Sequence, residues 1–114
     1  MYLSYETIDE QIGCIHLIGK LDIPGTHEVE LKFTVLTSTQ RKAVIVDLDQ
    51  VDLITSIGLG LLITNAKTLK AMGQQMVLLS PKPNVDKVIR MSGLGQLLPI
   101  EYDLKAALEH ILNT

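Results

Sequence analysis

Residues 43–72 read AVIVDLDQVDLITSIGLGLLITNAKTLKAM, and this stretch decides the fold. Its first part, Ala43–Leu48, is almost entirely apolar and rich in β-branched residues, which is typical of a strand covered on both faces. From Ile57 to Met72 the apolar residues instead recur at intervals of three and four, so they share one face of a helix. Gly73 follows where a left-handed residue commonly ends a helix. A buried strand followed by an amphipathic helix predicts an α/β architecture.

The rest of the chain continues this alternation. We expect further strands over four stretches: Tyr2–Glu6, Ile12–Ile18, Met76–Leu79 and Leu97–Ile100. We expect a helix over residues 84–92, ended by Gly93, and a last helix capped by Asp103. The last helix has one apolar stripe: Leu104, Leu108 and Ile111. The fold class is therefore α/β, a mixed sheet of roughly four to five strands with about four helices largely on one side.

The segment after Asp22 allows two interpretations. Polar and apolar residues alternate from Glu28 to Val35, which is typical of a strand. A helical stripe is also present: Val29, Phe33 and Leu36, widened by Leu31 and Val35. Asp22 can cap a helix, and Pro24 is tolerated in its first turn. Because the segment lies between two expected strands, where a crossover helix is common, we predict a helix.

Composition limits the classes of function. The 114 residues are 46% hydrophobic and 20% charged, which fits one globular domain over residues 1–114. The net charge of -3 argues against nucleic acid, because phosphate binding needs a concentrated basic face. No apolar run approaches the ~20 residues of a membrane span, and Met1–Glu10 lacks the features of a signal peptide. We expect a cytoplasmic protein that is a monomer when free and has neither nucleic-acid nor membrane partners.

The junction between the buried strand and the next helix, Asp52–Gly60, is the most informative site. Functional groups gather at the carboxyl ends of strands in α/β sheets. We expect a short loop here, then a helix beginning at or just after Ser56, which can cap that helix or carry a phosphate near its dipole. Gly58 and Gly60 each cost a helix up to ~1 kcal/mol relative to Ala. Either tight packing or close approach of a ligand explains them, and spacing alone favours a plain cap and packing.

Three motifs, in order along nearly the whole chain, resemble those of the STAS domain family, specifically its bacterial anti-sigma factor antagonists. Asp47-Leu48 followed by Thr55–Gly60 is similar to the family's Asp-Leu and Asp-Ser-Ser/Thr-Gly-Leu-Gly. Gly19–Asp22 resembles its Gly-Glu-Leu-Asp, and Met91–Leu94 resembles its Met-Ser-Gly-Leu. Two positions depart from the pattern, since Thr55 replaces the family's Asp and Ile57 replaces its second Ser/Thr.

The resemblance implies a protein-interaction switch without enzymatic activity, cofactor or metal. The unphosphorylated protein would bind an anti-sigma factor with GHKL-type serine kinase activity and so release a sigma factor. Phosphorylation at Ser56, or as a second choice at Thr55, would end binding, and a PPM-type serine phosphatase would restore it. Ile23 and Ile57 are then candidate exposed apolar anchors. The implied partner-binding residues are Asp22, Ile23, Thr55, Ser56, Ile57, Gly58, Leu59 and Gly60.

Two alternatives remain open. One is a STAS adaptor or scaffold subunit that is never phosphorylated, which the departures at Thr55 and Ile57 allow. The other is a small enzyme that uses Ser56 or the acidic residues at the strand end. Those residues, which could also hold Mg²⁺, are Asp47, Asp49 and Asp52. We favour the interpretation that these carboxylates are solvated or cap the loop, and Ser56 lacks the Gly-x-Ser-x-Gly elbow of hydrolases.

The histidines and the cysteine give weaker signals. The histidines lie on three different expected elements without paired spacing: His16, His27 and His110. We therefore expect no metal site. The single Cys14 excludes an internal disulfide and a cysteine-rich zinc site, and its apolar strand predicts an inert core thiol.

Overall fold

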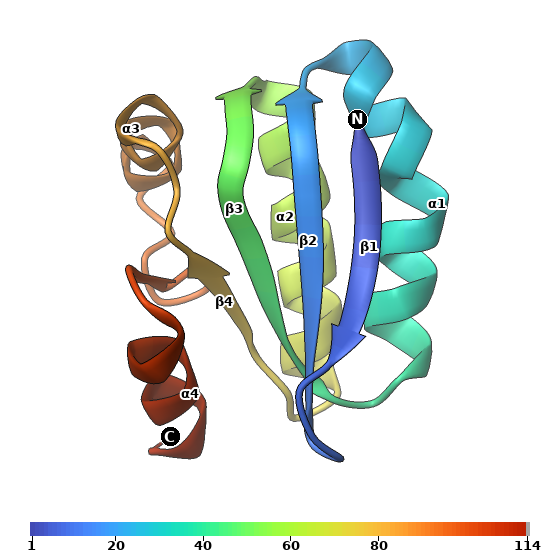
Figure 1. Cartoon of the computed structure of the whole chain (residues 1–114), viewed down its shortest axis with the longest axis vertical. Coiled ribbons are helices and arrows are strands. Elements are labelled where there is room, and N and C mark those ends of the chain that lie inside the picture. The colour runs from blue at the N-terminus through green and yellow to red at the C-terminus, as the bar shows by residue number, and fades with distance from the viewer. Residues whose placement is uncertain (114) are drawn as a thin grey trace.

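The computed structural model of the chain describes residues 1–113 as one mixed sheet with helices on both faces (Figure 1). The elements, in chain order, are β1 (Tyr2–Thr7), β2 (Ile12–Leu21), α1 (Ile23–Thr39), β3 (Ala43–Ile54), α2 (Ser56–Ala71), β4 (Met76–Leu79), α3 (Pro83–Met91), β5 (Ile100–Glu101) and α4 (Leu104–Leu112). The strand order is β1-β2-β3-β4-β5; β1 is antiparallel to β2, and the other neighbours are parallel. The predicted fold class is confirmed.

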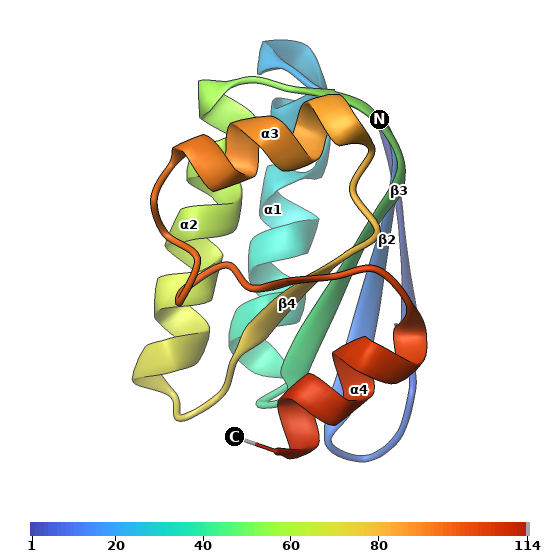
Figure 2. The same cartoon turned by 90° about the vertical axis from the view of Figure 1, so that its left-hand side faces the viewer.

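The two faces of the sheet are covered unequally (Figure 2). Side chains alternate along a strand, so Ile15 and Leu17 of β2 point to one face and Cys14 to the other. The first face packs against α1, α2 and α3 in the larger core, which includes the fully buried Phe33. Of the helices within residues 1–113, α4 covers the second face, through Ala107 and the partly buried Leu108 and Ile111. None of the helices in residues 1–113 combines the length and apolar character needed to span a bilayer.

The helix predicted after Asp22 is confirmed as α1. The Asp22 carboxylate accepts a hydrogen bond from the Gly25 N–H at 2.9 Å, and Pro24 lies in the first turn. Leu31 and Val35, which were expected to widen the buried stripe, are instead 77% and 46% exposed. Each lies two residues from Phe33, a rotation of about 200°, which places it on the opposite side of the helix. The buried positions are Gly25, Thr26, Val29, Phe33 and Thr37.

The sheet extends further toward α2 than predicted. We expected β3 to end near Leu48, followed by a short loop, but it continues to Ile54. Val51 and Ile54 are both buried, and β2 stays paired with β3 as far as Leu21. Only Thr55 therefore separates β3 from α2, and the predicted loop is wrong.

The helix ends follow local chemistry, whereas the C-terminal strand does not. Gly73 and Gly93 have φ of +76° and +72° at the ends of α2 and α3, as expected of glycine after a helix. The strand predicted over Leu97–Ile100 is wrong by about three residues. The N–H of Leu98 donates to the Leu94 carbonyl at 2.8 Å in a turn, and β5 begins only at Ile100.

The last helix is capped as predicted but buried differently. The Asp103 carboxylate accepts a hydrogen bond from the Ala106 N–H at 2.8 Å. Of the expected stripe, Leu108 and Ile111 are partly buried, but Leu104 is exposed. Ala107 takes the buried position because a small side chain lets α4 approach the sheet closely.

Candidate functional site

The candidate site lies where parallel strands β2 and β3 end and helices α1 and α2 begin, at the top of Figure 1. We call it the helix-start surface and define it as Asp22, Ile23, Thr55, Ser56 and Ile57. One carbonyl joins its two halves: the backbone N–H and the hydroxyl of Thr55 both donate to the Leu21 oxygen, at 3.0 and 3.1 Å. The segment after β3 is thereby fixed to the segment after β2.

Thr55, and not Ser56, is the N-cap of α2. Thr55 has the extended backbone of a cap (φ -108°, ψ 177°), but its hydroxyl is used by Leu21 and caps no N–H group. Ser56 is the first helical residue, and its side chain is exposed. No group within residues 1–113 forms a hydrogen bond with the Ser56 hydroxyl. The interpretation of Ser56 as an ordinary cap is therefore wrong.

The two glycines of the motif differ in what they allow. A Cβ at Gly58 would lie 2.5 Å from the Leu21 oxygen and 2.7 Å from the Leu21 Cβ. Gly58 is therefore required by the close packing of α2 on the end of β2, which confirms the packing interpretation. A Cβ at Gly60 would meet nothing within 4 Å, so neither packing nor a neighbouring chain segment requires that glycine.

The two candidate apolar anchors differ in exposure. Ile23 is the first residue of α1 and is 62% exposed, as expected of a contact residue. Ile57 was expected to be exposed but is half-buried. Its side chain lines a cavity of about 360 Å³ between α1 and α2. Leu59 is also half-buried and packs against the main core. Ile23 is therefore the apolar side chain that this surface offers most freely.

The acidic residues do not form the cluster that was considered. They lie inside β3, and their side chains have different surroundings. Asp47 is 2.8 Å from Nδ1 of His16, and it accepts a hydrogen bond from the Asp49 N–H at 3.0 Å. Lys82 donates to Asp52 at 2.6 Å, and this hydrogen bond lowers the pKa of Asp52. The carboxylates of Asp47 and Asp52 thus pair with different neighbours, and within residues 1–113 these three aspartates do not form a group that could hold a metal ion.

Sequence reasoning missed what surrounds Asp52 and Cys14. Lys82 and Asn84, at the start of α3, donate to the side chain and the carbonyl of Asp52, so α3 is tied to the end of β3. Cys14 is buried as expected, and burial, with the charges of Asp47 and Glu6, raises its pKa to about 12. No local sequence pattern predicts these contacts, because the partners lie far apart in sequence.

Comparison with known proteins places this geometry in a family. A family model described as the STAS domain matches residues 4–107. The chain is 28% identical to BtrV of Bordetella bronchiseptica, named for an anti-sigma factor antagonist, over 94% of this chain and 91% of that protein. It is 27% identical to the anti-sigma F factor antagonist of Lysinibacillus sphaericus, over 83% of this chain and 82% of that protein.

Solved structures show the same fold. The anti-sigma factor antagonist SpoIIAA in its unphosphorylated form is 22% identical, with a TM-score of 0.77 over 99% of this chain and 98% of that one. Bacillus SpoIIAA in its phosphorylated form is also 22% identical, with a TM-score of 0.73 over 96% and 99%. The family model spans most of the chain, and the fold agrees with it. The chain therefore belongs to the STAS domain family, and two relatives that it matches are named anti-sigma factor antagonists.

Proposed function

We propose that this protein is a cytoplasmic anti-sigma factor antagonist and not an enzyme. Its unphosphorylated form binds an anti-sigma factor that is a GHKL-type serine kinase, and a sigma factor is released. The kinase phosphorylates Ser56 and the complex dissociates; a PPM-type serine phosphatase then restores binding. Two relatives named as antagonists support this proposal, as does the similarity to a protein solved both with and without phosphate.

The observation that carries the proposal is the difference between two adjacent hydroxyls. Ser56 is exposed, and its hydroxyl has no hydrogen-bond partner within residues 1–113. The Thr55 hydroxyl is half-buried and donates to the Leu21 carbonyl. A kinase can therefore reach Ser56 without disturbing the fold, whereas phosphorylation of Thr55 would break the contact between the end of β2 and the N-cap of α2. This favours Ser56 as the acceptor.

The position of Ser56 also explains why phosphate would change binding and not folding. Phosphorylation adds about -1.5 to -2 charges. In the first turn of α2, free N–H groups and the helix dipole favour that charge locally. A partner seated on Ile23 would instead meet a new, strongly hydrated anion close to the carboxylate of Asp22. The cost of desolvating and repelling this charge falls on the interface.

Phosphosite mass spectrometry on the protein purified from its own host, during growth and stress, tests the proposal. We expect phosphate on Ser56 in a proportion that changes with condition. Ser56→Ala should abolish the modification, and Ser38→Ala, at an exposed serine of α1, should leave it unchanged. Phosphate on Thr55 would move the acceptor. If a partner co-purifies but this protein carries no phosphate in any condition, the switch is contradicted and the protein is an adaptor.

A further inference from the structure

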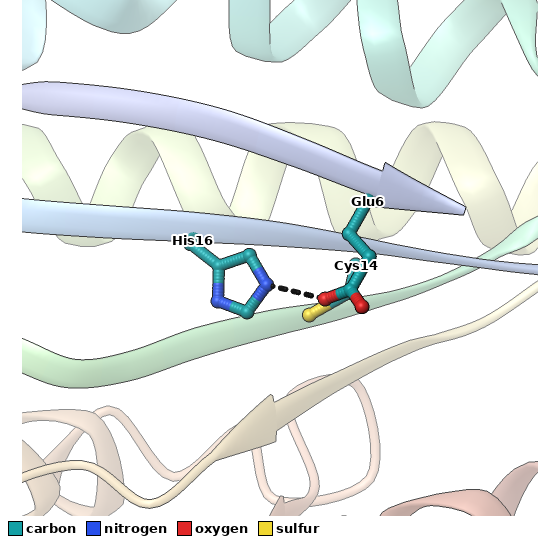
Figure 3. A group of neighbouring side chains, drawn as sticks. All are labelled: Glu6, Cys14 and His16. Carbon is teal, nitrogen blue, oxygen red and sulfur yellow. Dashed lines mark hydrogen bonds and ion pairs between the residues drawn. The ribbon is translucent and has the colours of Figure 1, made fainter. Parts of the chain in front are cut away.

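Three potential ligand side chains converge on the less covered face of the sheet. Glu6 of β1 is the cross-strand partner of Cys14 in β2, and His16 follows two residues later on the same face. We call these three residues the sheet-face cluster. A carboxylate oxygen, the Cys14 sulfur and an imidazole nitrogen all lie within 4.8 Å of one another (Figure 3). This is a different region from the helix-start surface, and the proposed switch does not use it.

The separations suit a tetrahedral zinc ion. Zinc binds thiolate, imidazole and carboxylate ligands at about 2.0–2.3 Å, so ligand atoms in a tetrahedron lie about 3.3–3.8 Å apart. The Glu6 oxygen and Nε2 of His16 are 2.9 Å apart, and the sulfur lies within the 4.8 Å limit. Each separation would therefore have to change by at most about 1.5 Å to reach the required geometry. The Glu6 side chain is 60% exposed and can make such a shift.

The His16 ring lies between two carboxylates. Nδ1 lies 2.8 Å from Asp47 and Nε2 lies 2.9 Å from Glu6, so both ring nitrogens face carboxylates. A neutral imidazole has one N–H. With that proton on Nδ1 and directed at Asp47, the lone pair of Nε2 would point at a carboxylate oxygen, which is repulsive. Either a second proton or a metal ion at Nε2 removes the conflict. For a metal ion, the carboxylate of Asp47 at Nδ1 is the usual support of a metal-bound histidine.

We propose that Glu6, Cys14 and His16 bind Zn²⁺ through a carboxylate oxygen, Sγ and Nε2, with water as the fourth ligand. Asp47 positions the imidazole through Nδ1–H. The sulfur–zinc bond forms as the thiol proton leaves to solvent, since the charge of a bound zinc ion favours thiolate. Sulfur and nitrogen ligands select zinc over Mg²⁺ or Ca²⁺, which prefer oxygen. The spacing of the histidines in the sequence does not indicate this site, because two of its three ligands are Glu6 and Cys14.

The route to the site is open on one side. The His16 side chain is 33% exposed, and that of Glu6 is more exposed. Cys14 is only 2% exposed and lies beneath them. An ion arriving from solvent would first meet the carboxylate and the imidazole and then the sulfur. With three protein ligands, the fourth position faces the solvent-exposed side of the cluster.

The test uses the full chain, freed of metal and titrated with Zn²⁺ against a chromogenic chelator, with Co²⁺ as a spectroscopic probe. We expect one Zn²⁺ per chain and, with Co²⁺, a sulfur-to-metal charge-transfer band. Cys14→Ala should abolish that band and weaken Zn²⁺ binding more than Asp47→Asn, for which we expect a loss of about 10–100-fold. His27→Gln, at an exposed histidine of α1, is the matched control and should change neither readout.

Three results would overturn the proposal. One is Co²⁺ binding by the unmodified chain without the sulfur band, a measurement that does not depend on whether any variant folds. Another is Zn²⁺ binding that survives Cys14→Ala but is lost in His27→Gln, which would show an adventitious surface site. The third is no Zn²⁺ binding at micromolar concentration, which would show that a proton alone supplies the positive charge between the carboxylates.

Discussion

The helix-start surface and the sheet-face cluster differ in how the chain assembles them. The first comes from two short segments, residues 22–23 and 55–57, which follow two parallel strands. It presents a hydroxyl, that of Ser56, with no hydrogen-bond partner within the described residues. The cluster comes from the antiparallel register of β1 and β2, and His16 has interactions at both ring nitrogens. The first region presents an exposed hydroxyl, whereas the second holds its polar groups against one another.

The two regions are also separate in space. Cys14 and Leu21 are seven residues apart along β2, a distance of about 23 Å at ~3.3 Å per residue. Substitutions farther apart than about 7–10 Å, without shared partners, have additive effects. Each region can therefore be disrupted while the other serves as an internal control.

The largest expected effect is on partner binding by Ser56→Glu. A fixed negative charge placed in a desolvated contact costs several kcal/mol, so affinity for the anti-sigma factor should fall by about 100-fold or more. Binding is measured by calorimetry or surface plasmon resonance with the purified partner. Ser38→Glu should bind normally, and the free energy of unfolding should change by no more than about 0.5 kcal/mol in either variant. Unchanged binding by Ser56→Glu would mean that the partner seats elsewhere.

The next effect separates the two glycines of the motif. Gly58→Ala forces a Cβ against the Leu21 backbone and should lower the free energy of unfolding by about 1–3 kcal/mol. Gly60→Ala enters open space in a helix and should raise it by up to ~1 kcal/mol. Urea denaturation of both variants measures the difference. Equal effects would contradict the account of α2 packing on the end of β2.

A smaller loss of affinity is expected for Ile23→Ala. If Ile23 is a hot spot of the interface, its truncation costs about 1–2 kcal/mol, so binding should weaken about 5–30-fold while stability is retained. Leu31→Ala is the matched control, because Leu31 is 77% exposed on the same helix but lies eight residues after Ile23, outside the helix-start surface. Equal losses in both variants would place the partner along the length of α1, beyond the helix-start surface.

The smallest expected effect is the loss of the Asp22 cap. Asp22→Ala removes the acceptor for the Gly25 N–H and should lower the free energy of unfolding by ~1 kcal/mol. Asp103→Ala removes the equivalent cap of α4 and should cost a similar amount. Thermal or urea unfolding measures both, and Zn²⁺ affinity should stay unchanged in Asp22→Ala. A change in that affinity would show that the two regions are coupled.

The sequence predicts features that arise from local chemistry. The alternation of strands and helices, the caps at Asp22 and Asp103, and the glycines that end α2 and α3 follow from short patterns. Tertiary contacts decide the rest. The extension of β3 to Ile54 depends on pairing with β2, and no sequence pattern near residue 50 predicts that pairing.

The same division holds for the sites. The Thr55–Gly60 motif directs attention to Ser56, but the roles of Thr55 and Gly58 depend on Leu21, more than thirty residues earlier. The sheet-face cluster depends wholly on the register that pairs Glu6 with Cys14. The sequence spacing of Glu6 and Cys14 does not indicate a metal site, so the cluster is found only in the three-dimensional structure.

Release from an immobilised partner measures whether phosphate on Ser56 dissociates the complex. The anti-sigma factor is immobilised, the protein is bound, and release is followed after ATP is added. The account predicts that ATP releases the unmodified protein with phosphate on Ser56, while Ser56→Ala binds and stays bound. Release of Ser56→Ala at the same rate, or retention of protein phosphorylated on Ser56, would contradict it.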